Sequence, residues 1–403
     1  MRFSERARAI TPSSTFAFDA RAKEMVRKGI DVVSFGTGEP DFDTPKLIQD
    51  AGIEAIQKGV TRYTPVAGLL PLREAICRKM KEDHGLSYEP SQVLVSSGAK
   101  MSLYIAFQVL LSPGDEVLIP APYWVSYVEQ VKLADGVPVI VPSTEKDGFR
   151  IKPEALRKYI TPKTRVLLLN SPSNPSGAVY TEAEIRAIAE VAREHDLTIV
   201  SDEIYEKLIY DGNSHFSIAQ VSPELKDRTI LINGVSKTYA MTGWRIGYAV
   251  GPKEAIKLMS NLQGHSTSNA SSIGQYASIT ALTGSQDAFR TMKAEFEKRR
   301  NLMVERVNKI PGFSCRKPEG AFYVFANISE LLHKTLSGVT INSGDDLADV
   351  LLDHAHVAVI PGSGFGMPDF VRFSYATSIN RIEEGLDRIR EYLSLQLNLE
   401  KVV

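Results

Sequence analysis

The stretch RVLLLNSPSNPSG (165–177) decides the fold, because it joins a continuous apolar run to a loop rich in proline and hydrogen-bonding side chains. Four apolar residues in succession, without the alternation of a half-exposed strand, are typical of a strand that is buried on both faces. Such strands occur in mostly parallel sheets that helices cover on both sides. The stretch therefore predicts one strand of a helix-covered sheet, followed by a loop that leads into a helix.

Similar runs recur along the first part of the chain, separated by longer helical patterns. The expected strands are QVLVSS (92–97), EVLIPA (116–121), RVLLLN (165–170), LTIVSD (197–202), TILING (229–234) and RIGYAVG (245–251). One helix has a clear start, since Thr181 and Glu184 form a capping box ahead of IRAIAEVAREH. This rhythm predicts an α/β fold with three layers, in which a mostly parallel sheet lies between two layers of helices.

After residue 251 the pattern becomes helical, and the charged segment 286–309 predicts a long, partly exposed helix. The motifs GAFYVFAN, VAVIPGSG and VRFSYAT, with a final amphipathic helix, predict a smaller α/β unit. The 403 residues exceed the ~250–300 at which a single core usually stops growing, so two domains are expected. Their junction is expected on the charged helix.

Composition excludes several functions. The net charge is -1 and no basic stripe is present, which argues against nucleic-acid binding. No apolar run reaches the ~18–20 residues of a membrane-spanning helix, and the N-terminus lacks the apolar core of a signal peptide, which favours the cytoplasm. The two cysteines and seven scattered histidines show no metal-binding spacing. The expected partner is therefore a small molecule.

Polar residues follow several of the predicted strands, at the edge where open parallel sheets bind ligands. Gly98, Ala99 and Lys100 open a helix whose N-terminal amides favour an anion such as phosphate. The loop 170–177 follows the predicted strand 165–170. Alone, the first feature could be a plain turn and the second a tight connection between strand and helix.

Two further strand ends carry charge. Asp202 ends one strand, with Glu203 and Tyr205 just after it, while Lys237 follows another strand and Arg245 begins the next. Each has an ordinary alternative: the acid could cap a helix, the lysine could extend to solvent and the arginine could form an ion pair. All four strand ends, however, are expected to meet at one rim.

A ligand that uses all these groups has a phosphate, a basic ring nitrogen, a phenolic oxygen and an aldehyde. Pyridoxal 5'-phosphate has each of them, and lysine is the residue that binds its aldehyde covalently. A dinucleotide is the competing ligand. It fits poorly, since GTGEPD (36–41) has Asp41 in place of the third glycine of the fingerprint and the chain has no P-loop.

Motifs along nearly the whole chain carry a family resemblance. They are GTGEPDFDTP (36–45), YTPVAGLLPLREAI (63–76), SSGAK (96–100), APYWVSY (121–127), NSPSNPSG (170–177), SDEIYE (201–206), SKTYAMTGWRIGY (236–248), GAFYVF (320–325) and VRFSYATS (371–378). The chain resembles the fold-type I, class I pyridoxal-phosphate aminotransferases, and most of all the bacterial and archaeal aspartate aminotransferases related to thermophile enzymes. The expected division is an N-terminal arm and part of the small domain in 1–45, a large cofactor domain in 46–288 and a small C-terminal domain in 289–403.

The resemblance implies roles at the cofactor. Lys237 would hold it covalently and move the substrate's proton, Asp202 would pair with the ring nitrogen, and Tyr205 and Asn174 would donate to its phenolic oxygen. Trp124 would stack on the ring. The phosphate would be bound by Gly98, Ala99, Lys100 and Arg245, with Ser236 as a weaker candidate, and by Tyr63 of a second subunit in a homodimer with shared sites.

The resemblance also implies substrate contacts. Arg372 would bind the α-carboxylate with two parallel hydrogen bonds, next to the Gly38 amide, Trp124 and Asn174. Because Arg372 and Lys237 belong to different domains, substrate binding is expected to draw the domains together. Ser14, Thr15 and Lys100 match the segment that contacts a distal carboxylate.

Two positions depart from the family pattern. Gly234 replaces a serine that contacts phosphate in some relatives, so this contact must come from elsewhere, with Lys100 and Ser236 as the candidates. Thr11 stands where relatives that also accept prephenate have a lysine, which argues against prephenate activity.

The expected reaction transfers an amino group from L-aspartate to 2-oxoglutarate in two stages. The alternatives are an aromatic, alanine or broad-range aminotransferase, and, in a different class, a carbon–sulfur lyase or a decarboxylase on the same scaffold. A non-catalytic effector-binding module is a further alternative. Only about 30 residues precede the first motif, too few for a DNA-binding domain, and Lys237 and Asp202 are both present.

Overall fold

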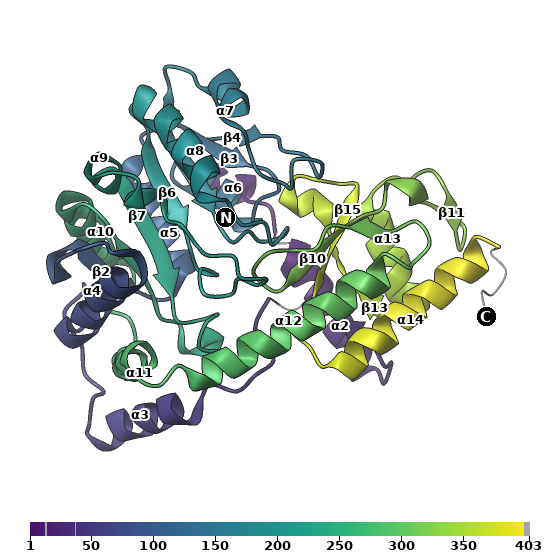
Figure 1. Cartoon of the computed structure of the whole chain (residues 1–403), viewed down its shortest axis with the longest axis horizontal. Coiled ribbons are helices and arrows are strands. Elements are labelled where there is room, and N and C mark those ends of the chain that lie inside the picture. The colour runs from purple at the N-terminus through teal and green to yellow at the C-terminus, as the bar shows by residue number, and fades with distance from the viewer. Residues whose placement is uncertain (13, 37, 399–403) are drawn as a thin grey trace.

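The computed structural model describes residues 1–12, 14–36 and 38–398, and only the backbone at 14–16. One sheet has seven strands in the order β2-β8-β7-β6-β5-β3-β4 (Figure 1). They are β2 (Val93–Ser96), β3 (Glu116–Pro120), β4 (Val137–Val141), β5 (Thr164–Asn170), β6 (Thr198–Asp202), β7 (Thr229–Gly234) and β8 (Gly247–Val250). Neighbouring strands pair in parallel except at β8, which is antiparallel to β2 and β7. The predicted mostly parallel sheet is confirmed.

Helices pack on both faces of this sheet because its strands are apolar on both sides. Along β5, Val166 and Leu168 lie in one buried cluster with residues of α5, whereas Leu167 and Leu169 lie in another with residues of α8. The helices of this unit are α3 (Lys46–Gln57), α4 (Leu70–His84), α5 (Ala99–Leu110), α6 (Ser126–Leu133), α7 (Pro153–Tyr159), α8 (Glu182–Glu194), α9 (Pro223–Lys226), α10 (Lys253–Ser266) and α11 (Ser272–Thr283). The predicted three layers are confirmed.

The capping box that begins α8 is also confirmed. The Thr181 hydroxyl accepts from the Glu184 backbone amide at 3.3 Å, and the Glu184 carboxylate accepts from the Thr181 amide at 2.8 Å. These two contacts satisfy amides that the first turn of a helix otherwise leaves unpaired. The sequence therefore located the start of this helix correctly.

Two expectations about the sheet need correction. β4 was not among the strands expected from the sequence; it is a partly exposed edge strand, and its Pro138 weakens the strand pattern. Arg245 does not begin a strand. It follows a short helical turn at Thr242–Trp244 and has a left-handed backbone (φ 56°), so the chain reverses there and β8 begins at Gly247.

A second unit is built on a smaller antiparallel sheet of order β14-β15-β10-β9. Its strands are β9 (Ser314–Cys315), β10 (Tyr323–Asn327), β14 (Ile360–Pro361) and β15 (Phe370–Ser374), and its helices are α12 (Asp287–Val307), α13 (Gly344–Val350) and α14 (Ile379–Gln396). Two small pairs add β11 (Thr335–Leu336) with β12 (Val339–Thr340), and β1 (Val33–Ser34) with β13 (Val357–Ala358). The predicted smaller α/β unit is therefore present.

Helix α12 confirms the long charged helix and runs alongside both units (Figure 1). Its Phe296 and Met303 lie in the core of the second unit, together with Val33 and Phe35 from the start of the chain. The domain limits at 45/46 and 288/289 stay predictions. Among the described residues, no helix combines the length and apolar character needed to cross a membrane.

Candidate active site

Most of the predicted site residues lie around one edge of the seven-stranded sheet. Because β2, β5, β6 and β7 run in the same direction, their carboxyl ends meet at this edge, and antiparallel β8 starts there. Lys100, Asn174, Asp202 and Lys237 come at or just after these strand ends, and Arg245 comes just before β8. This edge is where ligands bind in open parallel sheets.

Lys237 is a half-buried amine at the end of β7. Its Nζ donates to the backbone oxygen of Gly38 at 2.5 Å and lies 5.8 Å from the centre of the Phe322 ring. Burial lowers the pKa of Lys237 to about 8, with the positive charges of Arg245 and Arg372 adding to the effect against Glu39. Near neutral pH, more of this amine is therefore neutral and nucleophilic than in an exposed lysine.

Asp202 is the last residue of β6 and is 3% exposed. The Tyr127 hydroxyl donates to its Oδ2 at 2.7 Å, and the Ile204 amide donates to its Oδ1 at 3.2 Å. Burial raises the pKa of Asp202 to about 6, although both hydrogen bonds favour the ionised form. A cation placed beside this carboxylate would lower its pKa again.

Arg372 joins the second sheet to the rim of the first. It lies on β15, is 1% exposed, and donates from Nη1 to Asn174 Oδ1 at 2.9 Å and from Nη2 to the Gly36 oxygen at 3.0 Å. Its Nε is also buried and has no hydrogen-bond partner among the described residues. A buried donor without a partner requires an explanation, and an anionic ligand provides one.

Tyr205 and Tyr323 meet through their hydroxyl groups at 2.9 Å, and both side chains are buried. Tyr205 follows β6, whereas Tyr323 begins β10 of the second sheet. Burial and the Tyr323 contact raise the pKa of Tyr205 well above its usual range. Tyr205 is therefore a neutral hydroxyl that can donate a hydrogen bond.

The start of α5 and the loop before β8 form a cradle for an anion. Gly98 caps α5 with φ +88°, and a Cβ at this position would run into the guanidinium of Arg245. Arg245 is held by its own hydrogen bonds to the backbone oxygens of Thr242 (3.0 Å) and Ser97 (3.4 Å). Ala99 and the buried Ser236 lie on the two segments that border the cradle. The N-terminal end of a helix and a fixed cation together favour phosphate.

Lys100 and Trp124 lie together beside this cradle. The Lys100 ammonium is 4.8 Å from the centre of the Trp124 ring, and Trp124 packs edge-on against Tyr127 at 5.3 Å. Burial lowers the pKa of Lys100, and the charge of Arg245 adds to the effect. Trp124, the predicted stacking residue, is therefore one helical turn away from Tyr127, whose hydroxyl donates to Asp202.

Three predicted residues are not placed in the rim. Tyr63 is 90% exposed on the loop before α4. The side chains of Ser14 and Thr15 lie outside the described part of the structure, although their backbone opens α2 (Ser14–Arg27). A role for these residues stays a prediction.

Sequence reasoning missed Tyr127, Phe322 and Tyr323 as parts of the site. Tyr127 lies three residues after Trp124, a spacing that places both on one face of a helical turn, so this signal was available. Phe322 and Tyr323 belong to the GAFYVF motif, but nothing in their sequence shows which strand end they contact. They reach the rim only because the second sheet packs against it.

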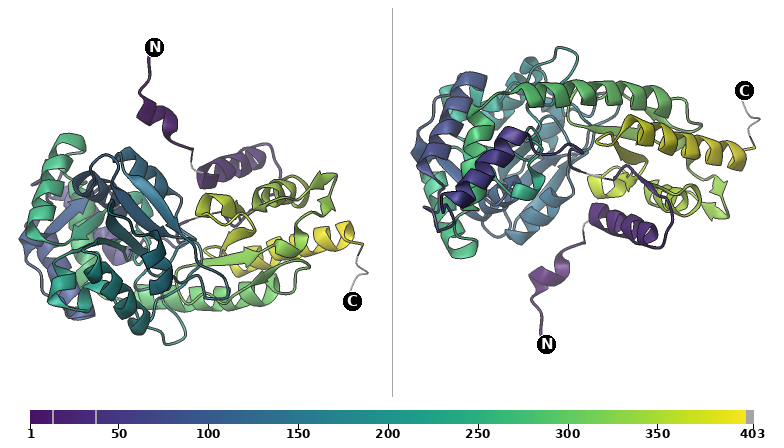
Figure 2. Two further views of the ribbon diagram at one scale, coloured as in Figure 1. Left: turned by 90° about the horizontal axis from the view of Figure 1, so that it is seen from above. Right: turned by 90° about the horizontal axis from the view of Figure 1, so that it is seen from below.

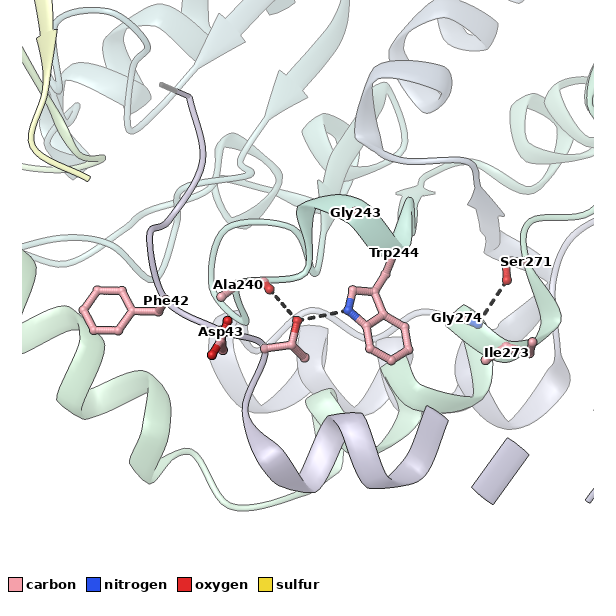
Figure 3. Close-up of a pocket in the computed structure, with 9 residues that line it drawn as sticks. Phe42, Asp43, Ala240, Gly243, Trp244, Ser271, Ile273 and Gly274 are labelled. Carbon is pink, nitrogen blue, oxygen red and sulfur yellow. Dashed lines mark hydrogen bonds between the residues drawn. The ribbon is translucent and has the colours of Figure 1, made fainter. Parts of the chain in front are cut away.

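A separate hollow of about 500 Å³ lies beside the 240–244 turn (Figure 3). Phe42, Asp43 and Trp244 line it, and the Thr44 hydroxyl accepts from Trp244 Nε1 at 3.0 Å and donates to the Ala240 oxygen at 2.6 Å. None of the predicted cofactor or substrate residues lines this hollow. It is distinct from the rim.

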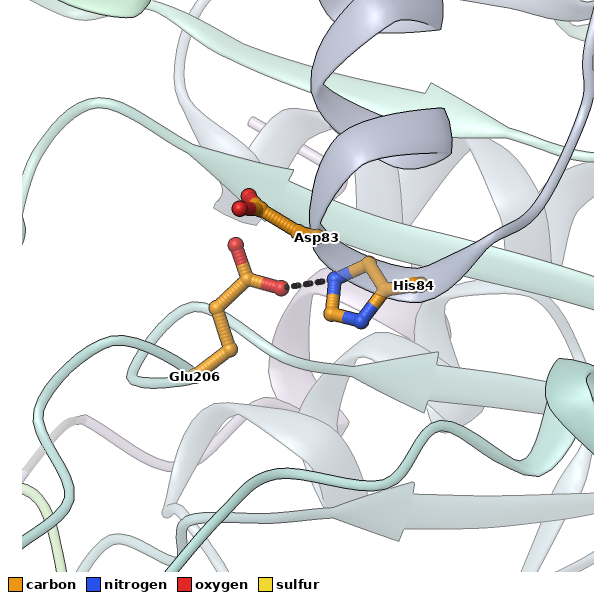
Figure 4. A group of neighbouring side chains, drawn as sticks. All are labelled: Asp83, His84 and Glu206. Carbon is orange, nitrogen blue, oxygen red and sulfur yellow. Dashed lines mark hydrogen bonds and ion pairs between the residues drawn. The ribbon is translucent and has the colours of Figure 1, made fainter.

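Asp83, His84 and Glu206 form a group with side chains suited to a metal ion (Figure 4). Glu206, however, accepts from His84 Nε2 at 2.7 Å and from the buried ammonium of Lys79, which also pairs with Asp83 at 3.1 Å. Although burial opposes its charge, Lys79 and His84 hold the pKa of Glu206 well below its usual range. A metal ion would have to displace Lys79, so we interpret this group as an internal ion network. That the protein needs no metal stays a prediction.

Comparison with known proteins identifies the family. The profile of the class I and II aminotransferases matches residues 30–389. The chain is 52% identical to the aspartate aminotransferase of Geobacillus stearothermophilus, covering 98% of this chain and 99% of the relative.

Solved structures agree. An aspartate aminotransferase from Rhizobium meliloti has a TM-score of 0.94 and 46% identity, covering 97% of this chain and 98% of that one. The Thermus thermophilus aspartate aminotransferase, solved with maleate, has a TM-score of 0.92 and 42% identity, covering 97% of this chain and 100% of that one. The chain therefore belongs to the class I and II aminotransferases.

The lowered pKa of Lys237 predicts how its reactivity depends on pH before any cofactor is bound. The neutral fraction of its amine should reach one half near pH 8, whereas exposed lysines reach one half near ~10.4. We expect labelling of Lys237 by a small amine-reactive reagent to rise through pH 8, measured by mass spectrometry of its peptide. Exposed Lys257 in the same digest is the control. A labelling rate that rises only near pH 10 would contradict the lowered pKa of Lys237.

Proposed function

We propose that the protein is a pyridoxal 5'-phosphate-dependent aminotransferase that converts L-aspartate and 2-oxoglutarate to oxaloacetate and L-glutamate. The observation that carries this proposal is the placement of Lys237 and Asp202 at neighbouring strand ends, with Arg372 of the second sheet bonded to Asn174 at the same rim. The family and its aspartate aminotransferase members support the same conclusion.

The residues of the rim fit this cofactor. The cradle of Gly98 and Arg245 would hold the phosphate, Asp202 would pair with the ring nitrogen, and Lys237 would bind the aldehyde. Tyr205 and Asn174 would donate to the phenolic oxygen, and Trp124 would stack on the ring. When bound, the cofactor supplies an aldehyde that accepts the amino group and a ring that withdraws electrons from the substrate's Cα.

The side chains of this protein would then divide the remaining work. Arg372 binds the α-carboxylate, and its unpartnered Nε is a donor left for that purpose. Lys237 Nζ, freed when the substrate's amino group takes its place on the aldehyde, would take the proton from Cα and return it to the cofactor, a role that its lowered pKa favours. Asp202 keeps the ring nitrogen protonated by a charge-assisted hydrogen bond. Closure of the second unit over the rim excludes water.

The choice of aspartate rests on fewer contacts. Arg372 recognises any amino acid, so the side-chain carboxylate must be read by other groups, which we assign to Lys100 and Thr15. The Thermus relative was solved with maleate, a four-carbon dicarboxylate, which supports a dicarboxylate site in this family. Small-molecule amino acids and 2-oxo acids are thus the proposed partners, and the cytoplasm is the proposed location.

The half-reaction tests the proposal directly. Amino acids added one at a time, without a keto acid, should remove the visible absorbance of the purified yellow protein fastest for aspartate and glutamate. A Lys237→Ala variant should keep cofactor through its other contacts but turn over ~10²–10⁴-fold more slowly. Formation of pyruvate with ammonia, or of CO₂, would instead indicate a lyase or a decarboxylase. An aromatic amino acid or alanine as the fastest donor would indicate the other substrate range.

The distal contacts predict a selective change in KM. Replacing Lys100 by Ala or Thr15 by Val should raise the KM for aspartate about tenfold or more and leave the KM for alanine within about twofold, since a lost charged hydrogen bond typically costs ~1.5–3 kcal/mol. Arg372→Lys is the matched control, and it should raise both KM values because both substrates have an α-carboxylate. Equal effects of the Lys100 variant on aspartate and alanine would refute its distal role.

We further propose a homodimer in which Tyr63 contacts the phosphate in the other subunit. Tyr63 is 90% exposed in the single chain, and α1 (Glu5–Ala9) projects from the body without a buried residue (Figure 2). Exposed aromatic side chains of this kind are typical of interfaces.

Mixed dimers test the shared site. A Tyr63→Ala subunit paired with a Lys237→Ala subunit has one native site only if Tyr63 acts across the interface. We therefore expect the mixture to regain up to about half the native activity per mixed dimer at limiting cofactor, measured after unfolding and refolding the two variants together. Activity no higher than the sum of the separate variants would show that Tyr63 does not act in the other subunit.

A further inference from the structure

The hydroxyl of Tyr323 lies between Tyr205, a predicted cofactor residue, and Gly38, a predicted substrate residue. It is 2.9 Å from the Tyr205 hydroxyl, and the two rings pack edge-on at 5.9 Å. It also faces Gly38, since a Cβ at that residue would lie 3.5 Å from it. The residue is 1% exposed, so this arrangement is not a surface contact.

The ring of Tyr323 has a second neighbour, Arg372. The guanidinium carbon of Arg372 is 4.4 Å from the ring centre. The two residues lie on adjacent antiparallel strands, where Tyr323 pairs with Ser374 and Phe325 pairs with Arg372. They are therefore diagonal neighbours on one face of the sheet, which fixes the ring under the guanidinium. The hydroxyl and the ring of Tyr323 thus contact different parts of the site.

The number of hydrogens shows which of the two hydroxyls donates to the other when a ligand is bound. Each tyrosine hydroxyl has one hydrogen and two acceptor positions. Only one of the two hydrogens can lie between the Tyr205 and Tyr323 oxygens. When the Tyr205 hydrogen points to a ligand oxygen, the hydrogen between the two hydroxyls must come from Tyr323. Tyr323 then stabilises the one orientation of Tyr205 that donates into the site.

Asn174 is oriented by a similar contact. Its Oδ1 accepts from Arg372 Nη1 at 2.9 Å, which leaves the amide NH₂ as the group available to donate to a ligand. Both donors predicted for the phenolic oxygen are therefore set by residues on the second sheet. Arg372 orients Asn174, and Tyr323 is placed to orient Tyr205.

We propose that Tyr323 is a positioning residue that directs the Tyr205 O–H to the phenolic oxygen of the bound cofactor. This inference rests on the proposed cofactor and goes beyond it by assigning a role to a residue that touches Tyr205 and Arg372. Loss of the Tyr323 hydroxyl removes the donor to the Tyr205 oxygen, so the Tyr205 O–H becomes a weaker and less fixed donor to the phenolic oxygen. The negative charge on the phenolic oxygen is then less stabilised, and the cofactor–lysine linkage becomes more basic.

The test is the pH midpoint of the visible absorbance of the holoenzyme, measured without substrate. Tyr205→Phe should raise this midpoint by about one pH unit, and Tyr323→Phe by about 0.5–1 unit, the scale of one hydrogen bond. In the Tyr205→Phe background, Tyr323→Phe should add no shift, because its effect passes through Tyr205. The KM for aspartate should stay within twofold in Tyr323→Phe, since the ring under Arg372 is retained.

Tyr375→Phe is the matched control. Tyr375 is equally buried, but its hydroxyl donates to the Ala321 oxygen at 3.1 Å and its loss should leave the midpoint unchanged. An unchanged midpoint in Tyr323→Phe, or an equal added shift in the Tyr205→Phe background, would overturn the proposal. A large rise in KM with an unchanged midpoint would assign Tyr323 to Arg372 instead. If the wild-type protein has no yellow chromophore, it is the proposed cofactor that fails, before any variant is made.

Discussion

The rim depends on the close packing of β8 against the start of α5. A Cβ at Gly247 would overlap the backbone of Gly98 and Ala99, so only glycine allows this approach. Since β8 must run back beside β7, the loop between them crosses the carboxyl edge of the sheet and carries Lys237 and Arg245 with it. At Gly98 the absence of a side chain lets the Arg245 guanidinium reach the helix start. Two glycines thus place a nucleophile and a fixed cation at one edge.

The charged groups at the rim lack enough stabilising partners within the protein itself. Burial raises the pKa of Asp202 to about 6 and lowers the pKa of Lys237 to about 8, so both groups shift toward their neutral forms. Arg372 is buried with an unpartnered Nε. A ligand with a cationic ring nitrogen, an aldehyde and an anionic group complements all three. Its binding should therefore also stabilise the folded chain, because the unfolded chain has no such site.

Much of this arrangement follows from local patterns in the sequence. Continuous apolar runs predicted the strands of the parallel sheet. The polar residues just after these runs predicted Asp202 and Lys237 as site residues, because the end of a strand can be recognised from the local sequence. What the sequence did not show depends on contacts between distant segments. The pairing of Tyr323 with Tyr205 requires the second sheet to lie against the first, and the reversed chain at Arg245 requires the antiparallel course of β8. β4 was missed because a partly exposed edge strand with a proline has a weak pattern.

Under the proposed role of Thr15, helix α2 connects substrate selectivity to closure of the second unit. α2 packs on the second unit through Ala22, which lies in one apolar cluster with Leu352 and Ala358. Arg21 on the same helix pairs with Asp353 at 2.6 Å. The exposed ion pair contributes little by itself, so the apolar contact carries most of the attachment.

Because α2 is attached to the unit that carries Arg372, any movement of that unit over the rim carries Thr15 with it, while Lys100 and Lys237 stay on the large sheet. The two carboxylates of a dicarboxylate substrate would then both be bound only in the closed state. A substrate without the second carboxylate would make fewer contacts in the closed state, so closure would be less favourable. Selectivity would therefore arise in the closing step as well as in the initial binding.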